Sequence, residues 1–120
     1  MIDHVGINVS DIEASKRFYE AALAPLGYVK IADFGEAVGF GQPGKPDFWL
    51  ETRGTPGTTH IAIVSPDRAT VHAFHEAALA AGGKDNGAPG PRPQYHETYY
   101  GGYVLDPDGH NVEAVCHAPG

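Results

Sequence analysis

The sequence is poor in cysteine, in positive charge and in long apolar segments. Its one cysteine, Cys116, excludes a disulfide within the chain and is typical of a reducing compartment. Eight lysines and arginines stand against fifteen aspartates and glutamates, and the formal net charge of −7 offers no basic surface for nucleic acid or an anionic membrane. No segment is long and apolar enough to span a bilayer, and no signal-peptide pattern opens the chain. We therefore expect a soluble cytoplasmic protein without nucleic-acid or membrane partners.

Several motifs of well-known enzyme classes are also missing. The chain has no Ser-centred nucleophile elbow, no Walker loop, no dinucleotide fingerprint and no cysteine pair for structural zinc. What it has in abundance is glycine and proline, sixteen and ten residues, which indicate many turns rather than long helices. Its 120 residues suffice for a single domain, residues 1–120, with a real core.

The sequence repeats itself without gaps at an offset of 56 residues. The segment His4-Val5-Gly6-Ile7 aligns with His60-Ile61-Ala62-Ile63, and residues 18–23 align with residues 74–79 at all but one position. A match that runs through a strand and a helix face predicts two copies of one supersecondary unit, about residues 1–55 and 56–120. The repeat places His4 and His60 at equivalent positions.

Each unit is expected to open with a strand and continue with a helix. In the first strand Val5, Ile7 and Val9 share one face, which should pack on a helix and leave the face of His4 to another partner. The spacing from Ser10 to Glu13 predicts a helix capped by Ser10.

The second helix should start at Ser65-Pro66-Asp67, with the proline in its first turn. Val71, Phe74 and Ala78 form its inner stripe, and His72 and His75 are expected at the surface.

Short strands complete each unit. They are expected at residues 28–34, 36–40 and 47–51 and again at 84–86, 99–105 and 110–116. Residues 87–93 are too rich in Gly and Pro for an ordinary strand. They are expected to form a loop, either at the mouth of a cavity or on a plain surface.

The last hairpin carries the residue that most needs an explanation. Asp106-Pro107-Asp108-Gly109 reads as a type I turn between two apolar strands. Glu113 lies in the second of these, between Val112 and Ala114, and a carboxylate there is costly to bury unless a cation accompanies it. A metal ion is one candidate. His110 has the opposite strand parity and is expected to meet solvent or the turn.

Two βαβββ units, a histidine at the start of each, and the block Asp106 to Glu113 resemble the vicinal oxygen chelate superfamily. This group includes glyoxalase I, the extradiol dioxygenases, and the bleomycin and fosfomycin resistance proteins. The resemblance implies an α+β fold in which curved mixed sheets surround a cavity with a divalent metal on its floor. The implied metal ligands are His4, His60 and Glu113. Two imidazoles and a carboxylate suit Zn, Ni, Mn or Fe and leave coordination positions open for substrate.

The resemblance also raises the question of a fourth ligand. Glyoxalase-type sites take one from the last strand of the first unit, where Glu51 is the acidic candidate. Strand parity leaves open whether Trp49 and Glu51 or Phe48 and Leu50 face inward, and a solvated Glu51 is the other interpretation. Glu51 would also be the catalytic base.

Further candidates to line the cavity and handle protons lie in residues 94–100. They are His96 and the neighbouring tyrosines, Tyr100 among them.

The resemblance, together with these residues, implies a glyoxalase-like, metal-dependent enzyme of lyase or isomerase type. Its substrate would be a small oxygenated molecule held through two neighbouring oxygens. Two alternatives stay open: a non-catalytic binding protein of the antibiotic-resistance type, and an extradiol-type dioxygenase that uses Fe(II). No Arg and Lys cluster for glutathione is evident, which argues against lactoylglutathione as substrate. The resemblance implies a homodimer, and the sequence leaves open whether a second chain completes the site.

Overall fold

The computed structural model describes residues 2–120, which form eight strands, two α-helices and one short 3₁₀ helix, η1. In chain order these elements are β1 (Val5–Asn8), α1 (Ile12–Leu23), η1 (Ala24–Leu26), β2 (Val29–Asp33), β3 (Ala37–Gly41), β4 (Phe48–Glu51), β5 (His60–Val64), α2 (Arg68–Ala80), β6 (Lys84–Pro91), β7 (Tyr100–Leu105) and β8 (Asn111–Cys116). Neither α-helix of this part of the chain is long and apolar enough to cross a membrane.

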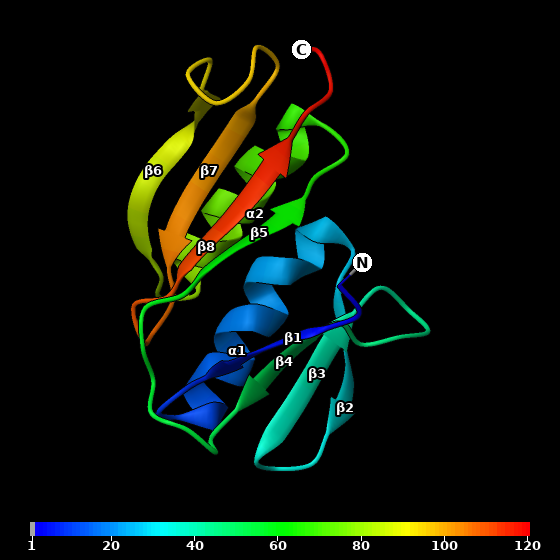
Figure 1. Cartoon of the computed structure of the whole chain (residues 1–120), viewed down its shortest axis with the longest axis vertical. Coiled ribbons are helices and arrows are strands. Elements are labelled where there is room, and N and C mark those ends of the chain that lie inside the picture. The colour runs from blue at the N-terminus through cyan, green and yellow to red at the C-terminus, as the bar shows by residue number, and fades with distance from the viewer. Residues whose placement is uncertain (1) are drawn as a thin grey trace.

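The strands form two four-stranded mixed sheets of the same design. Their orders are β1-β4-β3-β2 and β5-β8-β7-β6 (Figure 1). In each sheet the first strand of the unit pairs in parallel with the last, and the remaining pairs are antiparallel. The prediction of an α+β fold built from two βαβββ units is therefore confirmed.

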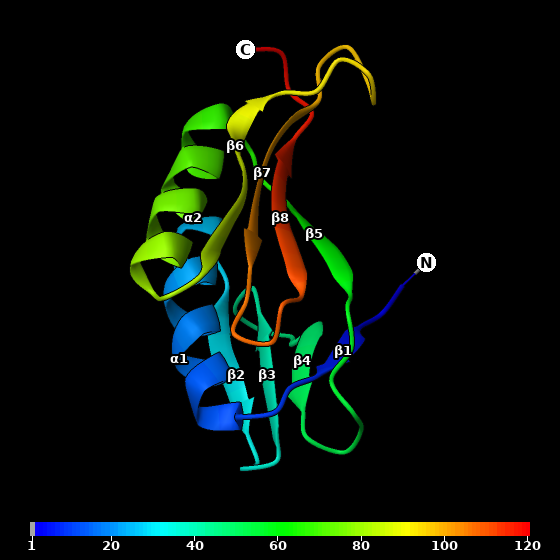
Figure 2. The same ribbon diagram turned by 90° about the vertical axis from the view of Figure 1, so that its left-hand side faces the viewer.

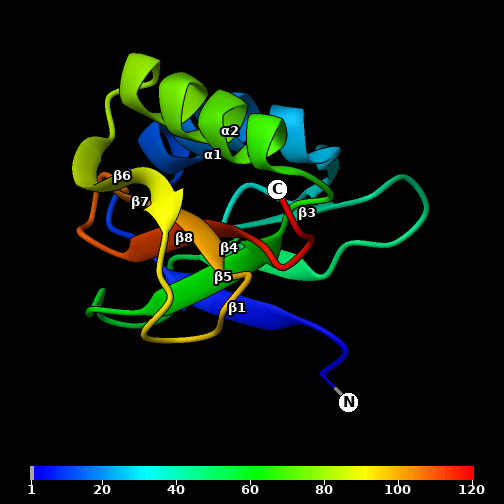
Figure 3. The ribbon, with the colours of Figure 1, turned by 90° about the horizontal axis from the view of Figure 1, so that it is seen from above.

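The two helices pack against each other and cover the same side of both sheets (Figures 2 and 3). The core lies between helices and sheets, where Ile7 and Val9 of the first strand and Val71, Phe74 and Ala78 of α2 are buried as expected. Each sheet therefore has a second face without a helix, which we call its open face. Residues that alternate with the core positions point to this face.

Each α-helix is preceded by an aspartate that caps its N-terminus. The N-cap of α1 is Asp11, whose carboxylate accepts two backbone N–H groups of the first turn at 3.1 Å, so the prediction of a Ser10 cap is wrong by one residue. The N-cap of α2 is Asp67, which accepts the N–H of Thr70 at 2.7 Å, and Pro66 precedes the helix instead of lying in its first turn. A carboxylate combines the capping bonds with a charge that suits the positive end of the helix dipole.

The glycine- and proline-rich stretch of the second unit forms a strand. β6 continues to Pro91, with register shifts on both sides of Gly87, so the prediction of a loop over residues 87–93 is wrong for most of its length. β6 is an edge strand and pairs only with β7. Prolines are tolerated there, because a residue whose backbone nitrogen faces away from β7 needs no N–H for the ladder.

β6 also brings Asp85 within 3.0 Å of His75. His75 is 7% exposed, so it is buried rather than at the surface as expected.

A buried polar contact joins the two units at the turn before β8. The Tyr19 hydroxyl donates to Asp106 Oδ2 at 2.7 Å, and Asp106 Oδ1 accepts the backbone N–H groups of Asp108 and His110. His110 Nε2 donates in turn to the carbonyl of Asn8 at the end of β1, 2.8 Å away. His110 is 1% exposed, so it meets the turn and the other unit rather than solvent.

Candidate functional site

Glu113 lies on the open face of the second sheet and is nevertheless fully buried. In the sheet register it stands between Ala62 of β5 and Tyr103 of β7. His60 Nε2 donates to its Oε1 at 2.7 Å, and the Tyr99 hydroxyl donates to its Oε2. Both carboxylate oxygens are thus satisfied by side chains, which offsets the cost of burying the charge.

The side chains around this carboxylate are mostly tyrosines. They line a pocket formed by His60, Tyr95, Tyr99, Tyr103, Asn111 and Glu113. Burial first and the bond to Glu113 second raise the pKa of Tyr99 well above its usual value, so Tyr99 keeps its proton and remains a donor at neutral pH. Burial likewise raises the pKa of Tyr103. The acidic group of the pocket, Glu113, therefore lies beside two phenols, Tyr99 and Tyr103, that keep their protons.

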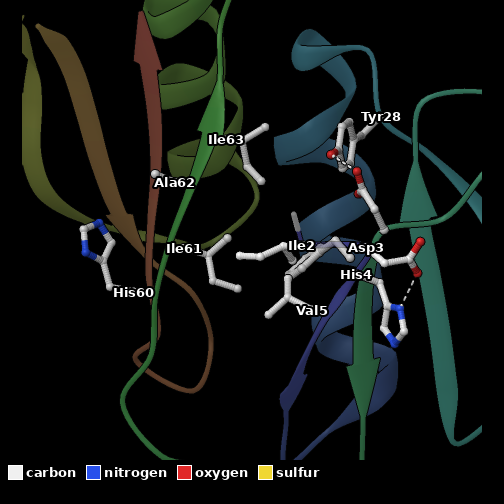
Figure 4. Close-up of a pocket in the computed structure, with 11 residues that line it drawn as sticks. Ile2, Asp3, His4, Val5, Tyr28, His60, Ile61, Ala62 and Ile63 are labelled. Atoms are coloured by element: carbon white, nitrogen blue, oxygen red, sulfur yellow. Dashed lines mark hydrogen bonds and ion pairs between the residues drawn. The ribbon is translucent and has the colours of Figure 1, made fainter.

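His4 does not join this group within one chain. Its Nδ1 lies 2.7 Å from the Asp3 carboxylate, and 59% of its side chain is exposed. Figure 4 shows His4 and His60 pointing away from each other, with apolar side chains such as Ile61 between them. Nowhere in residues 2–120 do three or more His, Cys, Asp or Glu side chains gather closely enough to hold a metal ion.

The open question about the parity of β4 has a clear answer. Phe48 and Leu50 are buried in the core, so Trp49 and Glu51 face the open side. The Glu51 carboxylate lies over Gly6, where an added Cβ would come within 3.0 Å of Glu51 Oε1. Glu51 therefore lies on the same face of the first sheet as Gly6, which is two residues from His4.

The sheet register identifies which residue of the first unit corresponds to Glu113. Gly6 and Ala62 are equivalent in the repeat, and they pair with Trp49 and Glu113 respectively. Trp49, not Glu51, therefore occupies the position of Glu113. The offset grows from 56 to 64 residues by the last strand, because β6 and its connection to β7 are together longer than β2 and its connection to β3. An ungapped repeat cannot reveal this, but the apolar parity of Phe48 and Val112 could have done so.

Comparison with known proteins agrees with this architecture. The sequence model of one protein family, the Glyoxalase/Bleomycin resistance protein/Dioxygenase superfamily, matches residues 1–114. The chain belongs to this superfamily. It is similar in structure to a glyoxalase/bleomycin resistance protein from Albidiferax ferrireducens T118, with 30% identity, a TM-score of 0.79, and coverage of 95% of this chain and 96% of that one.

Two further solved structures show the same fold at lower identity. A glyoxalase-related enzyme from Fulvimarina pelagi is 23% identical, with a TM-score of 0.75 over 97% of this chain and 87% of that one. A lactoylglutathione lyase from Agrobacterium tumefaciens is 20% identical, with a TM-score of 0.73 over 97% and 92%. No match was found among curated proteins.

Divalent metals are common in this superfamily, and the donors of the second unit suit one. An imidazole Nε2 and a carboxylate oxygen, 2.7 Å apart at His60 and Glu113, are ligand types that Zn, Ni, Mn and Fe accept. The hydrogen bond from Tyr99 fixes the other oxygen of Glu113, as outer-shell partners of metal ligands commonly do. His60 and Glu113 supply two metal-ligating atoms, and a third ligand must come from a residue outside this pocket.

Two other predicted site residues lie away from the pocket. His96 is exposed on the loop after β6, with Nδ1 3.1 Å from the Thr98 hydroxyl. Tyr100 faces α2 instead of the open side, and its hydroxyl lies 2.6 Å from His72 Nε2. The tyrosine that donates to Glu113 is the neighbour of Tyr100 in the chain, Tyr99.

Proposed function

We propose that this member of the glyoxalase superfamily is a metal-dependent enzyme of lyase or isomerase type. Its substrate would be a small molecule with two neighbouring oxygens. The observation that carries the proposal is the buried Glu113, which is paired with His60 and held by Tyr99. A divalent metal bound there would supply Lewis-acid stabilisation of an anion that forms on the substrate.

The proposed ligand set is His4, His60 and Glu113, with His4 contributed by a second copy of the chain. Two observations support a homodimer. His4 lies apart from the other two residues, and β1 and β5, which carry the two histidines, are both edge strands of their sheets. Exposed apolar side chains accompany these edges, with Ile2 86% and Val64 72% exposed. Unpaired strand edges with apolar neighbours favour association.

Within this scheme Glu51 is the proposed base. Its carboxylate lies over Gly6, next to His4 on the same face, so in the proposed dimer it would be near the bound substrate. A base must come within hydrogen-bond reach of the proton that it removes. His96 and Tyr100 receive no role here, whereas Tyr99 orients Glu113. We further propose that the protein works in the cytoplasm.

Metal content and its dependence on these residues test the proposal. Tag-free protein should retain about one equivalent of Zn, Ni, Mn or Fe per chain by elemental mass spectrometry, as expected for one ligand set per chain. His4→Ala and Glu113→Gln should each lose the metal, whereas the exposed His72→Ala should keep it. Retention of metal by Glu113→Gln would refute the assignment.

A mixing experiment tests the contribution of a second copy. His4→Ala supplies an intact Glu113 and Glu113→Gln supplies an intact His4, so co-refolding the two variants should restore metal binding in part. Absence of restoration in a confirmed mixed dimer would refute a shared site.

A set of three protein ligands also fits the alternative of a dioxygenase. Two histidines and one carboxylate with open positions are typical of oxygen-activating iron enzymes. Oxygen consumption by the Fe(II)-loaded protein in the presence of catechol would favour a dioxygenase over an isomerase. Stoichiometric ligand binding that a chelator leaves unchanged would favour the non-catalytic binding protein.

A further inference from the structure

The glycine- and proline-rich end of β6 holds an arginine side chain against the open face of the second sheet. The guanidinium of Arg92 lies over the ring of Tyr103, 5.3 Å from the ring centroid. Two carbonyl groups fix it there. Nη1 donates to the oxygen of Pro91 at 3.2 Å, and Nη2 donates to that of Ala88 at 2.9 Å. A guanidinium that lies over an aromatic face and binds two carbonyls is restricted in position and keeps its full charge.

The glycines of this stretch make room for the side chain. The backbone N–H of Arg92 donates to the carbonyl of Tyr99, and the guanidinium reaches back along β6 to Gly90 and Gly87. A Cβ on Gly90 would come within 3.1 Å of Nη1. A Cβ on Gly87 would lie 2.8 Å from the ring of Tyr103 and 3.5 Å from Nη2. The absence of side chains at these two positions therefore lets the guanidinium lie flat on the tyrosine.

The charge of this arginine has no acidic partner. Among residues 2–120, no carboxylate forms an ion pair with Arg92. A guanidinium has five N–H donors, and the two carbonyls use two of them, so three remain for a ligand. An unpaired guanidinium with free N–H groups suits the oxygens of a carboxylate or a phosphate.

The ring beneath the guanidinium also lines the pocket of Glu113, which measures about 480 Å³ and has room for a small molecule. Tyr103 pairs with Glu113 in the sheet register, and β7 lies between the acid on β8 and the strand that leads to Arg92. Asn111 lines the same pocket, and its Oδ1 accepts a hydrogen bond from Asn86 at 3.2 Å. The amide NH₂ of Asn111 therefore remains as a second donor at this pocket.

We propose that Arg92 forms an oxyanion-binding site at the edge of this pocket, where it binds a carboxylate or phosphate group of a small molecule. The free N–H groups of the guanidinium would bind two oxygens of one anion side by side. The inference goes beyond the proposed function and needs no metal, because the guanidinium itself supplies the positive charge. The two proposals can therefore be tested separately.

Inorganic phosphate and acetate are the probes, titrated into the full chain after EDTA has removed any bound metal. In proton–nitrogen NMR spectra at constant ionic strength, the Nε–H signal of Arg92 should shift and saturate with one or both anions. Arg92→Gln should bind that anion about tenfold more weakly, because the charge-assisted hydrogen bonds are lost. Arg92→Lys should recover part of the affinity, since an ammonium group keeps the charge but not the planar fork of donors.

Two further variants separate the position of the guanidinium from net charge. Gly90→Ala keeps the charge, and the backbone of Gly90 lies outside the left-handed region, so alanine is tolerated there. Its Cβ would displace Nη1, so we expect binding about threefold weaker than in the wild type. Arg17→Gln, at an exposed position on α1, removes the same charge as Arg92→Gln and should bind as the wild type does.

Each contrary outcome has a distinct meaning. Equal affinity of Arg92→Gln and the wild type would overturn the site, as would the absence of saturation with both anions. Equal weakening by Arg17→Gln and Arg92→Gln would assign the effect to net charge and overturn the site. Anion binding that occurs only after the protein is loaded with Zn would place the anion on the metal, which would support the proposed function and overturn the site at Arg92.

Discussion

Replacing Tyr19 with Phe removes a single hydroxyl from the contact that joins the two units. Tyr19 is 0% exposed, and its hydroxyl donates to an oxygen of Asp106, which is itself 5% exposed. The variant leaves that oxygen without a donor, whereas the other oxygen keeps the N–H groups of Asp108 and His110. The carboxylate therefore stays in place and loses one of its three hydrogen bonds.

The expected cost follows from burial and charge. A hydrogen bond to a charged group contributes about 1.5–3 kcal/mol, so we expect the free energy of unfolding to fall by about 2 kcal/mol. For a chain of 120 residues, with an unfolding entropy of about 2.1 cal/mol/K per residue, this corresponds to a fall in Tm of about 8 °C.

Urea unfolding, followed by circular dichroism and by the fluorescence of Trp49, measures the change. The slope of the transition should stay constant if only the stability is altered. Tyr28→Phe is the matched control, because its hydroxyl donates to Asp47 at 2.9 Å in a half-buried setting. The control should lose under about 1 kcal/mol, as a more solvated bond does. Equal losses in the two variants, at matched protein concentration, would refute the reasoning.

Three further predictions concern the metal and acid sensitivity. Glu113→Gln should abolish metal retention with the fold intact by circular dichroism, because a neutral amide is a weaker ligand than a carboxylate. Trp49→Glu should slow the loss of metal to EDTA, because it places an acid at the position equivalent to Glu113, and Glu51→Gln should not slow it. Hydrogen bonds with Thr70 lower the pKa of Asp67 below 3.8, so the stabilisation it gives is present above that value and is lost as the pH falls through the lowered pKa. Asp67→Asn should therefore show a shallower decline of Tm between pH 5 and pH 2, and an unchanged decline would contradict this account.

The repeat was visible in the sequence because burial imposes the same apolar pattern on both units. The proximity of His60 and Glu113 could be predicted from the sequence, since they lie on two strands of the same unit that pair with each other. His4 could not be located relative to them, because that depends on how the two units pack through α1 and α2.

Other details depended on interactions that residue types alone do not specify. Asp11 rather than Ser10 caps α1, since both are good capping residues and the backbone geometry chooses between them. The equivalence of Trp49 and Glu113 stayed hidden because a longer β6 and a longer connection to β7 lengthen the second unit. Tyr99 was one of several tyrosines in a row, and only the path of β7 determines which of them meets Glu113.

Equivalent register positions of the two units carry Trp49 and Glu113. The two halves of the duplicated chain therefore cannot replace each other. A chain made of two copies of residues 56–120 would carry two His–Glu pairs and no stacked Phe34 and Trp49. One made of two copies of residues 1–55 would carry the stacked rings twice and no acid at that register position. Mutations that enlarge or shrink the rings of the first half therefore leave the acid of the second half untouched.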